Sequence, residues 1–537
     1  MALYADLVVI NGKIITMDDD GRIANALAVR DGRIVAVRPT SDMKEFIGPD
    51  TKILDMGGKT VIPGLIDSHA HYMSAGSDRE IFVNLSEEAG VHCIADMQAK
   101  LKEKAKHTPK GEWIFGHQED DSKLKEQRHP TRWELDVAST DHFIVVTFVG
   151  GHFWMANSKA LEAAGVTKDT PDPVGGKFDR DPETGEIIGH LHEKAYDVIR
   201  PQGPPQPTRE QSYNGAKKIL EEAASVGLTC VYDLVDKPEI RAAIDLKNSG
   251  QLPIRFRMDI IIDLAPELGK LGIYQGLGDD WVRICGVKFF FDGAISARTA
   301  AVAEPYLNKP GFFGVLSTTE EIARKTLTDA YEKEIRISAH ANGERAINMY
   351  LDILEDLQTN YPREDPRNRT IHCTVINSEI VQRIKRLGIL PTIFGPYPYF
   401  HGDKLIPSFG EERLERMFAA RSFLDADVTV AAHSDHPCAP YPPLMGLHAL
   451  VNRTSKAGKP IGPSQRISVL EALKLYTVNA AYQQLDEDKL GSLEEGKLAD
   501  FVVLSDDIIT LPTEKIMDIQ VDMTVVGGHI VYRRHES

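Results

Sequence analysis

The stretch TVIPGLIDSHAH, residues 60–71, decides the fold more than any other part of the chain. Its apolar part is typical of a buried β-strand, and it ends in the polar run Asp67-Ser68-His69-Ala70-His71. Side chains two residues apart in a strand project to the same side, so His69 and His71 are expected to share one face. Two neutral imidazoles placed in this way can bind one divalent cation, typically zinc. The alternative is that the two histidines lie together by chance.

Seven further segments follow the same plan, with helical patterns between most of them. Together with residues 60–67 they make eight predicted strands that alternate with helices, which indicates a parallel sheet. Eight such units predict an α/β fold of the (β/α)8 type, a TIM barrel. The seven segments are residues 229–234, 254–262, 286–291, 335–341, 370–376, 389–394 and 428–435.

One connection is much longer than the others. Residues 72–210 separate the first two predicted strands and contain extra strand-like segments at 113–117 and 143–151. We interpret residues 72–210 as a segment inserted over the barrel mouth. If residues 143–151 were a barrel strand instead, every later strand would shift its register.

The two ends of the chain carry turn signals that the middle lacks. Two-residue turns of this composition are typical of β-hairpins. Because short terminal strands need a partner to bury their apolar face, we expect the two ends to form one composite β-sandwich from residues 1–59 and 485–537. Residues 60–484 would then be the barrel domain. The turn signals are Asn11-Gly12, Asp31-Gly32, Gly57-Gly58 and Gly527-Gly528.

Composition excludes several classes of protein. The 537 residues include 62 Lys and Arg against 79 Asp and Glu, a net charge of −17, which disfavours a nucleic-acid binder. No apolar run reaches the length of a membrane span, and the first residues lack the features of a signal peptide, so we expect a cytoplasmic protein without a membrane partner. The five cysteines include no CxxC pair, which argues against disulfides and a four-sulfur zinc site.

In a barrel of this type, catalytic groups lie at the C-terminal ends of the strands. Later predicted strands carry Lys288, His340, His372 and Asp435 at or near these ends. Alone, His340 and His372 fit core or capping roles, and Asp435 fits a helix cap. Their joint placement favours a metal site, where Asp435 can bind an ion and accept a proton from water.

Lys288 lies in the otherwise apolar segment VKFFF. Burial of an ammonium group is costly unless the group is neutralised. A neutral lysine can react with carbon dioxide to form a carbamate, which is an anionic bridging ligand for two metals. The alternative is an ion pair between Lys288 and a carboxylate such as Asp292.

The pattern resembles the amidohydrolase superfamily over nearly the whole chain. It is most similar to the amidohydrolase-3 branch, which includes N-substituted formamide deformylases. The segments that carry the resemblance are PGLIDSHAH (63–71), GHFWMANSKALEAAGV (151–166), GEIIGHLHEKA (185–195), VKFFFDGAISARTAAVAEPY (287–306), AHANGERAINMYLDILE (339–355), HSDHP (433–437) and GSLEEGKLADFVVL (491–504).

The resemblance implies a TIM barrel, a composite β-sandwich and a hydrolase with two divalent metal ions, zinc being the expected metal. It implies that His69 and His71 hold one ion with Asp435, and that His340 and His372 hold the other. Lys288 would be the carboxylated bridge, and Asp435 would also be the catalytic base.

The chain departs from the branch pattern at Ile371, Glu344 and His433, where the branch usually has Glu, Asp and Gly. His433 lies two residues before Asp435 and is expected to face the same side, as a donor near the metal, a substrate contact or a packed histidine. The other residues that we expect near the substrate, with packing or surface roles as the alternative, are His152, Glu193, Arg298 and, in the aromatic tract 394–403, Tyr397.

No P-loop, GxGxxG element or GxSxG elbow occurs, which disfavours nucleotide-dependent and serine-nucleophile chemistry. We therefore expect hydrolysis of an amide-like C–N bond (N-acyl, formamide or cyclic amide) in a small molecule, by a monomer or a homo-oligomer. One alternative is a deaminase or other non-amide hydrolase with one metal. The other is a catalytically inactive binding protein on the same fold.

Overall fold

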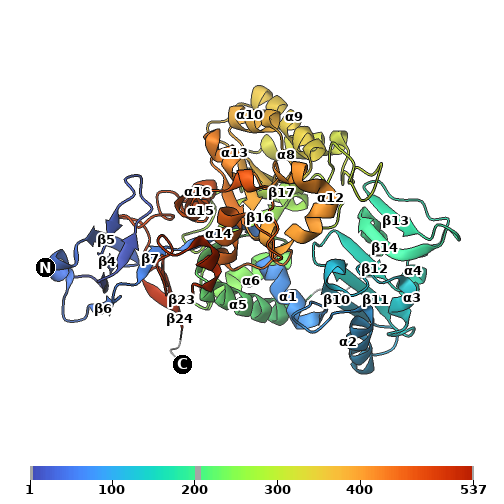
Figure 1. The fold of residues 1–537 in the computed structure, drawn as a ribbon, viewed down its shortest axis with the longest axis horizontal. Coiled ribbons are helices and arrows are strands. Elements are labelled where there is room, and N and C mark those ends of the chain that lie inside the picture. Colours follow the sequence, from blue (N-terminus) through green and yellow to red (C-terminus); the bar gives the residue numbers. More distant parts are fainter. Residues whose placement is uncertain (1–3, 200–206, 535–537) are drawn as a thin grey trace.

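The computed structural model describes residues 4–199 and 207–534. Its centre is an eight-stranded parallel sheet whose strands are adjacent in chain order (Figure 1). Two backbone hydrogen bonds join the C-terminal ends of the last and first strands: Asp435 N–H donates to His69 O at 3.1 Å, and His71 N–H donates to His436 O at 2.8 Å. The sheet thus closes into the predicted barrel. Its strands are β8 (Leu65–Ala70), β15 (Leu228–Val235), β16 (Arg255–Ile261), β17 (Val282–Phe290), β18 (Ile337–Ala341), β19 (Arg369–His372), β20 (Leu390–Phe394) and β21 (Ala431–His433).

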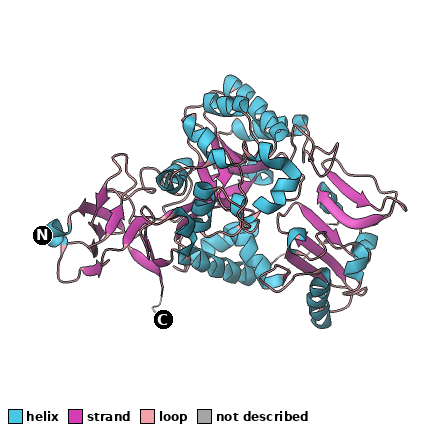
Figure 2. Cartoon of the chain, in the orientation of Figure 1, coloured by secondary structure: helices cyan, strands magenta, loops and turns pink. Residues whose placement is uncertain are grey.

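Helices surround the barrel (Figure 2). They are amphipathic: α9 (Glu344–Asn360), for example, buries Ile347, Leu351 and Leu354 along one face. Their apolar faces and the outward side chains of the strands form one large core. The other helices of this layer include α1 (Tyr72–Ile81), α5 (Arg209–Ser225), α6 (Lys237–Asn248), α8 (Glu320–Tyr331), α10 (Ser378–Leu387), α13 (Ala420–Asp425), α14 (Pro443–Asn452) and α15 (Val469–Leu475).

The first barrel strand begins at Leu65, later than predicted. Residues Thr60–Pro63 form β7, which pairs with strands of the sandwich instead. Gly64 lies between the two strands, and a Cβ atom there would lie 2.1 Å from Thr229 Oγ1, so only glycine lets the chain pass this close. The first barrel strand therefore ends at Ala70, so Asp67 and His69 lie within it and His71 follows it directly.

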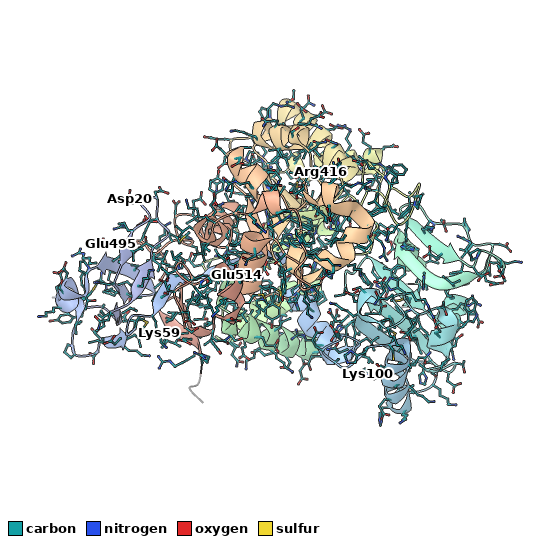
Figure 3. The ribbon with its side chains drawn as sticks, in the orientation of Figure 1. Asp20, Lys59, Lys100, Arg416, Glu495 and Glu514 are labelled. Carbon is teal, nitrogen blue, oxygen red and sulfur yellow. The ribbon has the colours of Figure 1, made fainter. Side chains whose placement is uncertain are left out.

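The sandwich is built from both ends of the chain. One sheet has the order β5-β4-β1-β6, and the other has the order β24-β23-β22-β7-β2-β3. The antiparallel pair β7–β22 joins the two ends, and Lys59 (labelled in Figure 3) adds an ion pair with Asp522 at 2.6 Å. The strands are β1 (Leu7–Ile10), β2 (Lys13–Ile15), β3 (Ile23–Ala24), β4 (Ala26–Arg30), β5 (Arg33–Arg38), β6 (Lys52–Asp55), β22 (Phe501–Leu504), β23 (Val521–Val526) and β24 (His529–Arg533).

Two of the four predicted hairpins are present. Asp31-Gly32 joins the paired strands β4 and β5, and Gly527-Gly528 joins β23 and β24. The predictions at Asn11-Gly12 and Gly57-Gly58 are wrong, because these turns join strands that belong to different sheets. A turn signal describes the local backbone, and it does not say which strand the next segment will pair with.

The long connection forms a mixed sheet of its own with the order β13-β14-β12-β11-β10-β9. The extra strand-like segments belong to this sheet. The first helix of the connection, α1, belongs to the barrel layer and packs closely on α5, where a Cβ on Gly76 would lie 2.4 Å from Gly215 O. The sheet lies on the side of the barrel away from the sandwich (Figure 1). Its strands are β9 (Val83–Asn84), β10 (Trp113–Glu119), β11 (Phe143–Phe148), β12 (Phe153–Ala156), β13 (Gly176–Arg180) and β14 (Ile187–Glu193), with helices α2 (Ile94–His107), α3 (Arg132–Asp136) and α4 (Ser158–Ala163). In the described part of the chain, no helix combines the length and apolarity needed to cross a bilayer.

Candidate metal centre

The predicted ligands meet at the C-terminal rim of the barrel. His69, Lys288, His340 and His372 are buried near the ends of β8, β17, β18 and β19, and Asp435 follows β21. His71 follows β8 directly and is the most accessible of the six, with 25% of its side chain exposed. The barrel topology thus brings together residues that are far apart in the sequence, as expected for parallel strands that end at one rim.

One cluster has the geometry of a metal site. His69 Nε2 and His71 Nε2 each lie 3.4 Å from Asp435 Oδ1. Two nitrogen or oxygen ligands at about 2.0–2.1 Å from a tetrahedral zinc lie roughly 3.3 Å apart, so these spacings fit an ion. Asp435 Oδ1 is also buried without a hydrogen-bond partner, a condition that an ion would relieve. Lys288 Nζ lies 2.9 Å from His69 Nε2 at the edge of this cluster.

A second cluster is centred on His372. Its Nε2 atom lies 3.0 Å from His340 Nδ1, and its Nδ1 atom lies 3.3 Å from His433 Nε2. The ligand atoms of His372, His433 and Asp435 all lie within 4.8 Å of one another. His433 thus lies against a predicted ligand, as its spacing from Asp435 suggested, and it is fully buried.

Burial sets the protonation states of these groups. It holds the pKa values of His69, His340 and His372 well below the usual histidine range, and nearby Lys288 lowers them further. Neutral imidazoles have a free lone pair, which metal binding requires. Burial also lowers the pKa of Lys288 to about 7, which makes its neutral amine available near neutral pH. Burial would raise the pKa of Asp435, but the His71 ring 3.4 Å away and the charges of His433 and Lys288 outweigh it and lower the pKa to about 2.

Two buried aspartates, Asp67 and Asp292, hydrogen-bond to the segments that carry the predicted ligands. Asp67 accepts hydrogen bonds from Ser434 Oγ at 2.5 Å and Tyr72 Oη at 2.9 Å, which fixes the turn that carries Asp435. Asp292 accepts three backbone N–H groups, from Ala301, Asn342 and Gly343, at 2.8–2.9 Å. Among the described residues Lys288 forms no ion pair with Asp292; the carboxylates whose charges act most on Lys288 are Asp435 and Asp259.

The backbone is strained at two of these positions. His372 has a φ of 74° and Asp435 has a φ of 58°, values that non-glycine residues seldom adopt. Such conformations cost of the order of 1–3 kcal/mol each and tend to occur where function over-determines the structure.

The predicted substrate residues fall into two groups. His152 lines the cavity above the centre, with its ring 4.8 Å from that of His340, and its Nδ1 lies 2.9 Å from Glu193 Oε2. Arg298 instead donates to Asp121, which follows β10 in the inserted segment, at 3.2 Å. Tyr397 is buried and stacks on Phe394 at 3.8 Å, in an apolar cluster behind the histidines, and does not form a wall of the cavity.

The cavity has a volume of about 260 Å³ and is roofed by the inserted sheet. Its walls include His117, Gln118 and the segment 147–152 from the inserted sheet, with Asp78 from α1 and Cys438 beyond β21. His117 is a cavity residue that was not predicted, although it ends the strand-like segment WIFGH (113–117), the same signal that pointed to His340.

Fold and rim together describe a TIM barrel with a composite sandwich and a histidine-rich candidate metal site. A model of the amidohydrolase family matches residues 52–532, and the chain belongs to this family of metal-dependent hydrolases. It is 29% identical to putative amidohydrolase YtcJ of Bacillus subtilis over 97% of this chain and 98% of that protein. It is 28% identical to N-substituted formamide deformylase of Arthrobacter pascens over the full length of both.

A solved structure extends the likeness to three dimensions. An uncharacterized metal-dependent hydrolase from Pyrococcus horikoshii matches with a TM-score of 0.75 and 25% identity, covering 94% of this chain and 99% of that one. The predicted family and fold are thus confirmed.

Proposed function

We propose that this protein hydrolyses an amide-type C–N bond of a small molecule, with two divalent metal ions held at the barrel rim. The convergence of His69, His71 and Asp435 on one point, next to a lysine with a pKa of about 7, carries the proposal. The similarity to a formamide deformylase over the whole chain supports the choice of an amide bond.

The donor set fits the proposed metal. Two histidines and one carboxylate would hold the first ion: His69 Nε2 and His71 Nε2 each lie 3.4 Å from Asp435 Oδ1. Lys288, once carboxylated, would supply a bridging carbamate to a second position beside His340 and His372. A divalent ion bound there supplies Lewis acidity, which acidifies water and polarises a carbonyl oxygen.

Asp435 is the proposed general base. Its low pKa keeps it ionised at neutral pH, so it can accept the proton of the attacking water and then donate it to the leaving amine. Its position is fixed through Ser434, which donates to Asp67 from both Oγ and N.

Two histidines have proposed positioning roles. His433 contacts the Nδ1 atom of His372 and would fix the ring orientation of this ligand, as outer partners of metal-bound histidines do. His152 lines the cavity and is held by Glu193, which raises the pKa of His152 although burial opposes the shift. His152 is thus placed to contact the bound amide.

A screen of formamides, N-acyl amines, lactams and esters with the metal-loaded protein tests the reaction class. The Asp435→Asn variant should lower kcat by roughly 10²- to 10⁴-fold on any amide that is hydrolysed, while metal content stays largely intact. Asp352→Asn on the exterior of α9 serves as the matched control and should leave kcat unchanged. Undiminished turnover in Asp435→Asn would contradict the role of Asp435.

A mononuclear deaminase or non-amide hydrolase is the second candidate, because the His69–His71–Asp435 cluster is by itself a complete three-ligand site. Metal stoichiometry by mass spectrometry separates the two: about two ions per chain favours the first proposal, and one ion with ammonia release from an aminated ring favours the second.

A further inference from the structure

A second cavity lies next to the one above the metal centre. It has a volume of about 390 Å³ and shares four lining residues with the first cavity: His117, Gln118, Val149 and Pro437. The two cavities therefore adjoin at these four residues, so a substrate whose reacting bond lies over the metal ligands has the second cavity next to it, on the side of His117.

His117 lies at this junction with an unsatisfied polar atom. It is 7% exposed, and its Nε2 atom is buried without a hydrogen-bond partner. A buried polar group left unpaired costs about 1–3 kcal/mol, so an unpaired ring nitrogen at the wall of a cavity is a position where a ligand gains affinity. Burial, with a smaller contribution from Arg79, lowers the pKa of His117 to about 4, so the ring is neutral and can either donate or accept.

The rest of the second cavity is flat and largely apolar. Phe400, Tyr441 and the prolines at 437, 440 and 442 line it, together with Ala439. Flat rings and proline faces are suited to contact with a planar group.

The charges around the second cavity are nearly balanced. Arg79 pairs with Glu222 at 2.6 Å, and Glu222 also accepts a hydrogen bond from Tyr441 at 3.2 Å. Glu88 is exposed at the edge. Arg79 is the one Lys or Arg side chain among the described lining residues, and it is already paired, so a carboxylate in the cavity would find no free guanidinium and would lose its hydration. A neutral substituent is favoured.

We propose that the second cavity binds a neutral, planar aromatic substituent of the substrate, and that His117 hydrogen-bonds to a polar atom of this substituent. This inference rests on the proposed function, because it takes the first cavity as the place of the scissile amide. It narrows the substrate class to amides with an uncharged aryl or heteroaryl arm.

Binding of 4-hydroxybenzamide to the metal-loaded full-length protein, measured by calorimetry, tests the inference without requiring turnover. The wild-type protein should bind this probe at least about tenfold more tightly than acetamide, which lacks the ring, and than 4-carboxybenzamide, which carries a charge. Failure of the probe to bind, or equal affinity for the charged analogue, would overturn the inference.

Two variants locate the site. Val149→Trp fills the junction between the cavities and should weaken probe binding by at least about tenfold, whereas Val137→Trp, at a position that is 62% exposed and remote from both cavities, should not. His117→Leu should weaken it by roughly three- to tenfold, the usual effect of one hydrogen bond. Thermal unfolding checks that each variant is folded. Unchanged binding in both Val149→Trp and His117→Leu would place the probe elsewhere and refute the proposal, whereas failure of hydrolysis alone would refute only the proposed function.

Discussion

The two ends of the barrel both bury ionisable side chains, and they do so in opposite ways. At the end facing the sandwich, Arg255 donates to both carboxylate oxygens of Asp500 at 2.7 and 2.8 Å, and Arg257 pairs with Asp486 at 2.7 Å. At the other end, neutral histidines face one another, and Asp435 Oδ1 has no hydrogen-bond partner. The ion pairs of Arg255 and Arg257 are complete in themselves, whereas Asp435 Oδ1 at the rim lacks the hydrogen-bond partner that a bound ion would replace.

The two ends of the barrel should therefore differ in whether their buried charges contribute to folding stability or to ligand binding. In a buried ion pair each charge is compensated by the other, so removing one partner is costly, and the intact pair offers nothing to a ligand. A buried group without a partner costs stability unless a metal or substrate relieves it. The comparison therefore predicts that equivalent substitutions at the two ends will have different consequences.

The largest expected effect is on stability, at the satisfied end. Asp486→Asn leaves the buried charge of Arg257 without its partner and should lower the free energy of unfolding by about 3–5 kcal/mol. Turnover per folded molecule should be unchanged. Chemical denaturation of the metal-free protein measures the first quantity. The matched variant Asp435→Asn should cost less, about 2 kcal/mol, because its pKa is held at about 2 and the ionised carboxylate therefore stabilises the folded state at neutral pH. An equal loss in both variants would break the comparison.

The next effect is on activity, at the unsatisfied end. Lys288→Ala removes the proposed bridging ligand and should reduce both metal content and turnover, the latter by at least about 100-fold. Because the substitution leaves a space, added acetate or propionate should restore part of both. Metal analysis with and without the added carboxylate is the measurement. Full metal content in the unrescued variant would argue against a bridging lysine.

A smaller effect concerns pH. Lys288 is neutral above its pKa of about 7 and protonated below it, and only the neutral amine can attack carbon dioxide. At constant dissolved carbon dioxide, the rate at which the metal-free protein becomes active after metal addition should fall about tenfold per pH unit below 7 and level off above it. A rate that is flat between pH 5 and 9 would contradict carbamate formation at Lys288.

The smallest effect belongs to the surface of the sandwich. Lys59→Ala removes an ion pair whose lysine side chain is 44% exposed, and it should cost less than about 1 kcal/mol of unfolding free energy. Thermal or denaturant unfolding measures this loss in unfolding free energy, which is then compared with the loss in Asp486→Asn. A cost of several kcal/mol would mean that the exposed pair contributes as much as a buried one.

The sequence predicted the barrel and the rim ligands because both depend on short-range patterns. Strand ends are marked by the change from apolar to polar residues, and parallel strands place those ends at one rim. Thus His69, His340 and His372 could be placed together without any knowledge of contacts. The predicted start of the first strand failed, because nothing in TVIP distinguishes a strand of the sandwich from a strand of the barrel.

The roof of the site could not be predicted in the same way. His117 lies over the centre only because the inserted sheet docks on that side, and its own sequence neighbours do not specify this. Arg298 and Tyr397 also follow barrel strands, but Arg298 pairs with Asp121 and Tyr397 packs against Phe394, and neither lines the cavity above the centre.

The pairing of β7 with β22 has a consequence for how the protein is made. During synthesis the N-terminal strands leave the ribosome first, but their partners at the other end of the chain leave last. The apolar edge of β7 must therefore wait, uncovered, until translation is nearly complete. A protein shortened at its C-terminus would keep every predicted ligand and still expose this edge, which makes it a candidate for aggregation and degradation before it can bind a metal.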